Sequence, residues 1–232
     1  GIYIALTKFN IKITIPSIRD IKYHLREGWY VFISTIAINM YTTTNTFLLG
    51  LLTNNTLVGY YSIAEKIILA VNGLLNPISQ ALYPFISRTV KTDDKTRSIE
   101  FIRKITKIMT LVGIVLSAGL FIFAKPIILL LFGQSYVNSV IILQIISIAV
   151  SLSTVFGVET MLTFNYKKAF TSIVMIGGII DIVLGIILIT LMKEIGIAIS
   201  FATTEIFITI AMFIFLQRKG IKIINRNHTK LS

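Results

Sequence analysis

Long apolar segments alternate with short polar connections along this chain of 232 residues. A helix needs about 20 apolar residues to cross the hydrocarbon core of a bilayer. Segments of about that length or longer are residues 29–52, 57–87, 108–124, 140–162, 169–192 and 195–216. They are too long and too uniformly apolar to be the strands of a membrane barrel. The pattern therefore predicts an all-α fold, a polytopic transmembrane helical bundle of six spans.

The segments outside the spans divide the chain into three parts. Residues 1–28 are expected to hold the end of a preceding span and an amphipathic linker on the cytoplasmic membrane surface, and a plain solvated linker fits the same residues equally well. Residues 29–217 form the six-helix lobe, and residues 218–232 form a basic cytoplasmic tail. Because the sequence lacks an initiator Met and its first residues read as the end of a helix, we expect a fragment of a longer protein.

Composition supports a membrane environment. Hydrophobic residues make up 55% of the chain and charged residues 14%, whereas soluble domains carry about 25% charged residues. Cysteine is absent, which excludes disulfides and thiolate metal sites. The two histidines, His24 and His228, lie in predicted loops without partners at ligand spacing. We therefore expect a membrane protein with no metal site and no cofactor, rather than a soluble enzyme.

Positive charges gather in four connections that fall on the same side of the predicted bundle. Most of the 22 lysines and arginines lie within residues 8–26, 88–107, 167–168 and 218–230. Lys125 and Lys193 fall on the other side, and Lys66 lies inside a span. Because basic loops stay on the cytoplasmic side of a membrane, both ends of the chain are predicted to be cytoplasmic. This topology also explains the net charge of +12 without nucleic-acid binding.

Polar residues recur at helical spacing inside three of the spans. The sets are Thr35, Asn39, Thr42 and Thr46 in the first span, Ser62, Glu65, Asn72, Asn76, Ser79 and Tyr83 in the second, and Gln144, Ser147, Ser151 and Thr154 in the fourth. Such faces either join packed helices through hydrogen bonds or line a water-filled cavity. We favour a cavity that binds sugar hydroxyls. Its candidate substrate-pathway residues are Asn39, Lys66, Asn72, Asn76, Ser79 and Gln144.

Four acidic residues lie inside predicted spans, where a charge is costly unless it faces protein or water, and one of them, Glu159, lies near the cytoplasmic end of its span and could reach water. Asp181 and Glu205 fall near the midplane of the last two spans, and Glu65 lies in the outer half of the second. Each residue is either part of a structural ion pair or a functional group. We treat Asp181, Glu205 and Glu65 as candidates for coupling a conformational change to the uptake or release of an ion.

Four short strings carry a resemblance to a known family. They are LVGYYSIAEK at 57–66, LNPI at 75–78, LYPFISR at 82–88 and PIILLLFGQSY at 126–136. In order and spacing they resemble the oligosaccharide flippases of the O-antigen type, which belong to the MOP superfamily of MATE-like exporters. The resemblance implies a twelve-helix protein with two six-helix lobes around a central cavity. This chain would be its C-terminal lobe.

The resemblance also implies a function and partners. Such proteins move undecaprenyl-diphosphate-linked oligosaccharide, an O-antigen or capsule repeat unit, across the bacterial inner membrane by alternating access. Membrane lipid, a polysaccharide polymerase and the chain-length machinery are the implied partners. The family's cavity is rich in cations, whereas Lys66 is the one cation inside a predicted span here. The diphosphate would therefore meet either the other lobe or Arg88, Arg103 and Lys107 at the cytoplasmic mouth.

Two other classes of function fit parts of the sequence. A MATE-type drug or cation exporter would use acidic residues such as Asp181 and Glu205. A membrane enzyme of polysaccharide assembly would place His, Asp or Arg in a sizeable outer loop. The predicted outer loops are short and contain no His. We therefore expect a transporter without catalytic residues.

Overall fold

The computed structural model describes residues 17–91, 95–153 and 157–221. All regular structure in these ranges is helical, which confirms the predicted all-α fold. The elements are α2 (Ile18–Leu52), α3 (Asn55–Lys91), α4 (Lys95–Ile122), α5 (Ala124–Phe132), the 3₁₀ helix η1 (Gln134–Tyr136), α6 (Ser139–Ser153), α7 (Gly157–Thr163) and α8 (Lys167–Arg218).

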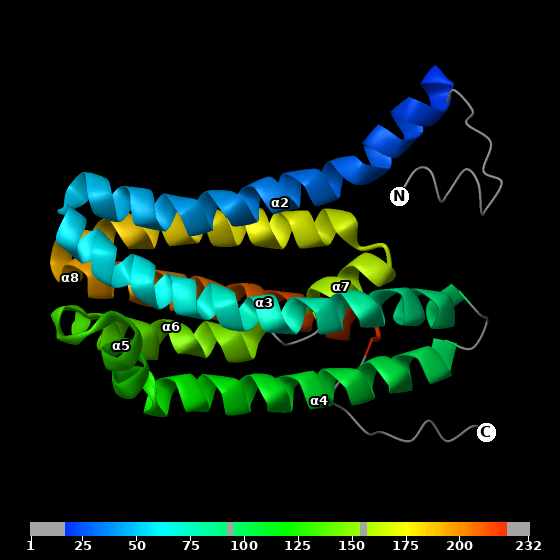
Figure 1. Cartoon of the computed structure of the whole chain (residues 1–232). Helices are drawn as coiled ribbons and strands as arrows, with labels where there is room; N and C mark the ends of the chain where they lie inside the picture. The colour runs from blue at the N-terminus through cyan, green and yellow to red at the C-terminus, as the bar shows by residue number, and fades with distance from the viewer. Residues whose placement is uncertain (1–16, 92–94, 154–156, 222–232) are drawn as a thin grey trace, which may run out of the picture.

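The long helices run side by side, and their connections lie at two opposite ends (Figure 1). The α2–α3 turn, α5 and the middle of α8 lie at one end, which we call the turn end. The start of α2, the end of α3, the start of α4, α7 and both termini of α8 lie at the other. We call this the basic end, because these segments carry most of the described lysines and arginines. The prediction that the basic connections share one side of the bundle is confirmed for the described residues.

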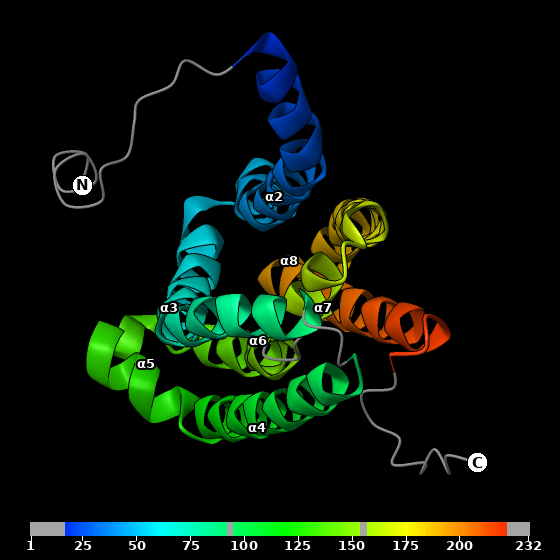
Figure 2. The same ribbon diagram turned by 90° about the vertical axis from the view of Figure 1, so that its right-hand side faces the viewer.

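α3 changes direction between its first and second halves, which is clearest when the bundle is viewed along its length (Figure 2). Gly73 and Pro77 lie in the middle of this helix. Proline has no backbone N–H and cannot donate to the carbonyl four residues earlier, here that of Gly73, so a helix bends readily at this point.

α8 is a hairpin. A straight helix of its 52 residues would be about 78 Å long, far more than the hydrocarbon core of roughly 30 Å. Lys193 has φ 50° and ψ −126°, and this one non-helical residue divides α8 into a first arm (167–192) and a second arm (194–218). Both arms reach the basic end (Figure 1). They correspond to the predicted fifth and sixth spans.

Glycines let the two arms approach closely. A Cβ added to Gly196 would overlap the backbone carbonyl of Leu188 on the other arm. A Cβ added to Gly177 would lie 2.6 Å from Cγ1 of Ile208. Helix pairs in membranes associate through this kind of close van der Waals packing, because lipid supplies no hydrophobic force between them.

Several described helices are long and apolar enough to cross a membrane, judged by length and composition. They are Asn55–Leu75 within α3, Glu100–Ile122 within α4, and Lys167–Arg218, which is α8. Thr43–Leu52 and Ser139–Leu152 are shorter apolar helices. α6 and α7 both fall within the predicted fourth span, and residues 154–156 between them, Thr154 included, lie outside the described ranges. A multi-pass helical membrane protein is thus confirmed, and the count of six spans stays a prediction.

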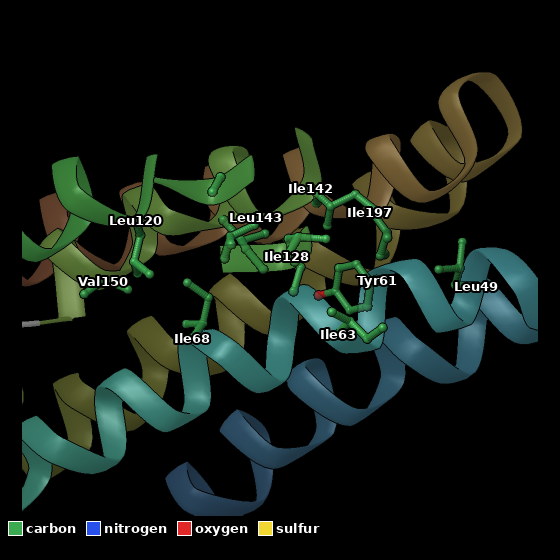
Figure 3. Packing of buried hydrophobic residues seen from close by; sticks show 14 of the residues in the cluster. Leu49, Tyr61, Ile63, Ile68, Leu120, Ile128, Ile142, Leu143, Val150 and Ile197 are labelled. Carbon is green, nitrogen blue, oxygen red and sulfur yellow. The ribbon is translucent and has the colours of Figure 1, made fainter. Parts of the chain in front are cut away.

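The distribution of apolar side chains agrees with a lipid-embedded bundle. Leu130, Leu74 and Leu191 are each more than 70% exposed, whereas soluble monomers rarely leave large apolar patches in water. Inside the bundle, Tyr61 and Ile197 belong to the main core cluster, in which α3, α5, α6 and the second arm of α8 meet (Figure 3). This core fixes α3 against the α8 hairpin.

Candidate functional site

α2 presents one polar face to the α8 hairpin and another away from it. Ser34 and Asn45 are buried, with exposed fractions of 1% and 0%, whereas Thr35 and Asn39 are exposed. Neighbouring residues on a helix point about 100° apart. Two members of the predicted stripe, Thr35 and Asn39, therefore lie on the outward face of α2, whereas the half-buried Thr46 points toward α3. Ser34 and Asn45, on the inward face, each precede a residue of the predicted stripe by one position. This inward face was not predicted.

Asp181 lies in the first arm of α8, is fully buried, and is held by the second arm. The Ser200 hydroxyl donates to Asp181, at 2.9 Å from its backbone oxygen and 3.1 Å from its Oδ1. The Thr204 hydroxyl donates to the same Oδ1 at 3.2 Å. Ser200 and Thr204 are four residues apart and thus share one face of the second arm. One carboxylate oxygen is therefore bound across the hairpin.

The other oxygen of Asp181 has no hydrogen-bond partner, although it is buried. Asn45 lies beside this carboxylate and beside the Tyr61 hydroxyl, yet neither its Oδ1 nor its Nδ2 meets hydrogen-bond geometry. Gly185 lets the second arm approach closely here, because an added Cβ would lie 2.9 Å from Cδ1 of Ile197 and 3.7 Å from the Ser200 hydroxyl. An unpaired buried polar group costs about 1–3 kcal/mol. Three buried polar atoms that miss hydrogen-bond geometry lie together here, which makes this place a candidate site.

Tyr61 closes this site from α3. Its side chain is 2% exposed and interacts electrostatically with Asp181 and with Glu65. Glu65 in turn accepts a hydrogen bond of 3.2 Å from the Thr46 hydroxyl of α2. We call Asn45, Tyr61, Asp181, Ser200 and Thr204 the Asp181 cluster. It joins α2, α3 and both arms of α8.

The predicted coupling residues differ in their surroundings. Asp181 is the centre of the cluster, and Glu65 lies at its edge. Glu205 is half-buried and has interactions of its own. It follows Thr204 directly and so points about 100° away from it.

The predicted substrate-pathway residues lie on several surfaces. Lys66 is exposed and interacts electrostatically with Glu65, Asn39 is exposed, and Asn72 is half-buried. Gln144 donates through Nε2 to the carbonyl oxygen of Phe121 in α4, at 3.2 Å. Asn76 and Ser79 follow on α3, but their side chains lie outside the described residues. Arg88 and Lys107 lie in helices at the basic end.

Sequence reasoning missed Asn45, Tyr61, Ser200 and Thr204. Ser200 and Thr204 have helical spacing in the last span, which indicates a polar face on that helix but not the residue that it contacts. Among the described residues, no group of three or more His, Cys, Asp or Glu side chains could hold a metal ion. The cluster instead offers amide, hydroxyl and carboxylate oxygens, which suit a proton or a small monovalent cation.

Comparison with known proteins agrees with the resemblance found in the sequence. Residues 1–90 match the family model "Polysaccharide biosynthesis protein". The chain is 39% identical over 209 residues to "Putative O-antigen transporter" of Escherichia coli (strain K12), which covers 89% of this chain and 50% of that protein. A protein of the same name from Shigella dysenteriae is 27% identical over 199 residues, covering 84% of this chain and 49% of that protein.

The chain spans about half the length of these curated relatives. The similarity covers nearly the whole chain and accompanies an all-helical fold with apolar, membrane-length helices. The chain is therefore a multi-pass helical membrane protein related to the O-antigen transporters, over about half of their length.

Proposed function

We propose that the chain is the C-terminal lobe of a transporter that moves undecaprenyl-diphosphate-linked oligosaccharide across the bacterial inner membrane by alternating access. The similarity to O-antigen transporters over 89% of the chain carries this proposal. A protein with two lobes can open a shared cavity to each side of the membrane in turn, so no covalent chemistry is required. A polysaccharide polymerase and the chain-length machinery would be the functional partners.

The outward face of α2 and the adjacent part of α3 form the wall that we assign to the substrate. Asn39 and Lys66 are exposed and Asn72 is half-buried, and all three lie on these two helices. The inward face of α2 is occupied by the α8 hairpin. The outward polar face is thus available to a cavity shared with the other lobe. Amide groups there suit sugar hydroxyls, and the Lys66 ammonium suits a diphosphate.

We assign ion coupling to the Asp181 cluster. A buried carboxylate with one unpaired oxygen, beside an unpaired amide, gains from binding a proton or a monovalent cation. Its ligands come from α2 and from both arms of α8, so occupancy changes how tightly these helices are held together. Glu65 and Glu205 are second candidates for the same role, since both are half-buried acidic residues within apolar helices.

The MATE-type exporter is the alternative among transporters. An organic cation would need an acidic group in the substrate cavity, but Asp181 is fully buried within the lobe and bound by Ser200 and Thr204. This arrangement favours coupling over drug binding. We also propose that the chain has no catalytic activity, in keeping with relatives that are named as transporters.

Deletion of the gene for the full-length protein tests the proposal. The deletion strain should accumulate the lipid-linked repeat unit on the cytoplasmic leaflet and lose surface polysaccharide, and a plasmid copy should restore both. Normal surface polysaccharide together with greater sensitivity to cationic drugs would instead identify an exporter of the MATE type.

A further inference from the structure

A pocket of about 400 Å³ lies at the basic end, between the first and last turns of α8. Its lining residues are Asn165, Tyr166, Lys167, Lys168, Ala169, Phe215 and Lys219. We call it the Lys219 pocket. None of these residues belongs to the Asp181 cluster, and the volume falls in the range of small-ligand sites.

The C-terminal cap of α7 fixes the short connection between α7 and α8. Asn165 has φ 61°, and its backbone N–H donates to the Leu162 oxygen at 3.1 Å. The N–H of Tyr166 donates to the Met161 oxygen at 2.8 Å. This pair of bonds around a left-handed residue is a Schellman motif. It holds Tyr166 in one position at the pocket wall, packed in the same core cluster as the buried Met161.

The far end of α8 closes with a second motif of the same kind. Gly220 has φ 78°, its N–H donates to the Gln217 oxygen, and the N–H of Ile221 donates to the Leu216 oxygen, both at 3.0 Å. Leu216 and Ile221 are both buried in the same core cluster, as is usual for the apolar pair that accompanies this motif. Lys219 is therefore held between a helix and a buried anchor rather than on a loose tail.

Aromatic rings join the two sides of the pocket. Tyr166 and Phe215 pack edge to face, with ring centroids 5.3 Å apart. The Lys219 ammonium lies 5.8 Å from the centre of the Phe215 ring. Aromatic and cationic side chains in this combination are typical of the boundary between hydrocarbon and water.

The charged residues that line the pocket all have the same sign. Lys167, Lys168 and Lys219 supply three positive charges, and no acidic residue is among the lining residues. Both ends of α8 line the pocket, and their opposite partial charges offset each other, so the lysines supply the positive charge. The pocket is thus complementary to a compact anion.

We propose that the Lys219 pocket binds the phosphate of an anionic phospholipid headgroup, with the Tyr166 and Phe215 rings against the lipid backbone. Basic pockets between membrane helices bind such headgroups, and each lysine near an anionic surface contributes about 1 kcal/mol. A free phosphate would use the ammonium groups alone and leave the aromatic wall without a partner. This inference is independent of the proposed transport function, because it concerns the surrounding lipid and not the transported one.

The test is lipid retention by the full-length protein, measured by native mass spectrometry in detergent with phosphatidylglycerol as the probe. The wild type should retain phosphatidylglycerol in preference to phosphatidylcholine. The variant Lys167→Ala/Lys168→Ala/Lys219→Ala should bind roughly ten-fold more weakly or worse. The control Arg19→Ala/Lys22→Ala/Lys104→Ala removes the same charge from exposed helix positions outside the pocket and should bind like the wild type.

Two further variants distinguish loss of lipid binding from loss of folding. Lys219→Ala alone changes a residue beyond the last turn of α8 and should weaken retention without loss of folding. Replacing all three lysines by arginine keeps the charge and should retain the lipid. Equal retention by the triple alanine variant and the wild type would overturn the proposal. So would equal loss in the control, or displacement of the lipid by millimolar inorganic phosphate or by undecaprenyl phosphate in preference to phosphatidylglycerol.

Discussion

The Ser34 hydroxyl on α2 lies 2.7 Å from the Thr171 hydroxyl on α8, and both side chains are buried. The Thr171 hydroxyl also donates to the Lys167 carbonyl at 2.9 Å. This hydrogen bond links the inward face of α2 to the hairpin near the basic end.

Ser34→Ala should lower stability only modestly. Hydrogen bonds between membrane helices average about 0.6 kcal/mol, and Thr171 keeps its bond to the Lys167 carbonyl. Thermal unfolding of the purified protein in detergent should show a shift of a few degrees at most. Thr43→Ala, at an exposed position of the same helix, is the matched control and should show a smaller shift. A loss of several kcal/mol in Ser34→Ala would mean that α2 depends on this bond far more than the structure indicates.

Asp181→Asn should slow transport while the protein still inserts and folds. The amide keeps the shape and can still accept from Ser200 and Thr204, but it cannot carry the charge that an ion or proton would neutralise. The measurement is surface polysaccharide at matched protein levels, together with its dependence on sodium and on pH. Glu205→Gln tests the second candidate in the same assay. Wild-type transport and wild-type ion dependence in Asp181→Asn would leave the cluster with a purely structural role.

Gly196→Ala should disrupt the hairpin. The added Cβ would overlap the backbone of Leu188, which cannot move without separating the two arms. Overpacking inside a well-packed core costs about 1–3 kcal/mol, and a backbone clash belongs at the upper end. Gly119→Ala on α4 is the control, because nothing lies within 4 Å of its added Cβ; there alanine should stabilise the helix by up to about 1 kcal/mol. Equal unfolding temperatures for the two variants would contradict the close packing of the arms.

Lys66→Ala should reduce transport more than Lys66→Arg. If the exposed ammonium meets the diphosphate, arginine keeps the charge and alters only its shape and hydration. The readout is the lipid-linked repeat unit that accumulates on the cytoplasmic leaflet. Normal transport by Lys66→Ala would place the diphosphate in the other lobe or at the basic end.

Single cysteines test the orientation. The chain contains no native cysteine, and Asn54 and Gln217 are exposed residues close to the turn end and the basic end. In a full-length protein otherwise free of cysteine, a membrane-impermeant maleimide should label Asn54→Cys in intact cells and Gln217→Cys only after lysis. The reverse pattern would place the basic end outside.

The helical fold and the central position of Asp181 were predictable, because span length and the rarity of charge in lipid are properties of local sequence. The partners of Asp181 were not. Ser200 and Thr204 reach it only because the break at Lys193 sets the register between the arms, and no local pattern encodes that register.

Polar spacing was also an ambiguous signal. On α6, the hydroxyls of Ser147 and Ser151 donate to carbonyls of their own helix, those of Gln144 and Ile148. A serine satisfied in this way can face protein, lipid or water. On α2, the choice between the face of Asn45 and the face of Asn39 depended on which side the hairpin packs, a tertiary property that the sequence of α2 alone does not contain.

The one-residue break at Lys193 also determines which changes in length the protein tolerates. An insertion or deletion in either arm would rotate every later side chain by about 100° and shift it by about 1.5 Å along the helix. No loop at the tip could absorb that change, since helical backbone resumes at once on both sides. Ser200 and Thr204 would then no longer bind Asp181, and Gly196 would no longer pack against Leu188. Over evolution, this pair of helices should therefore vary by substitution while keeping its residue count.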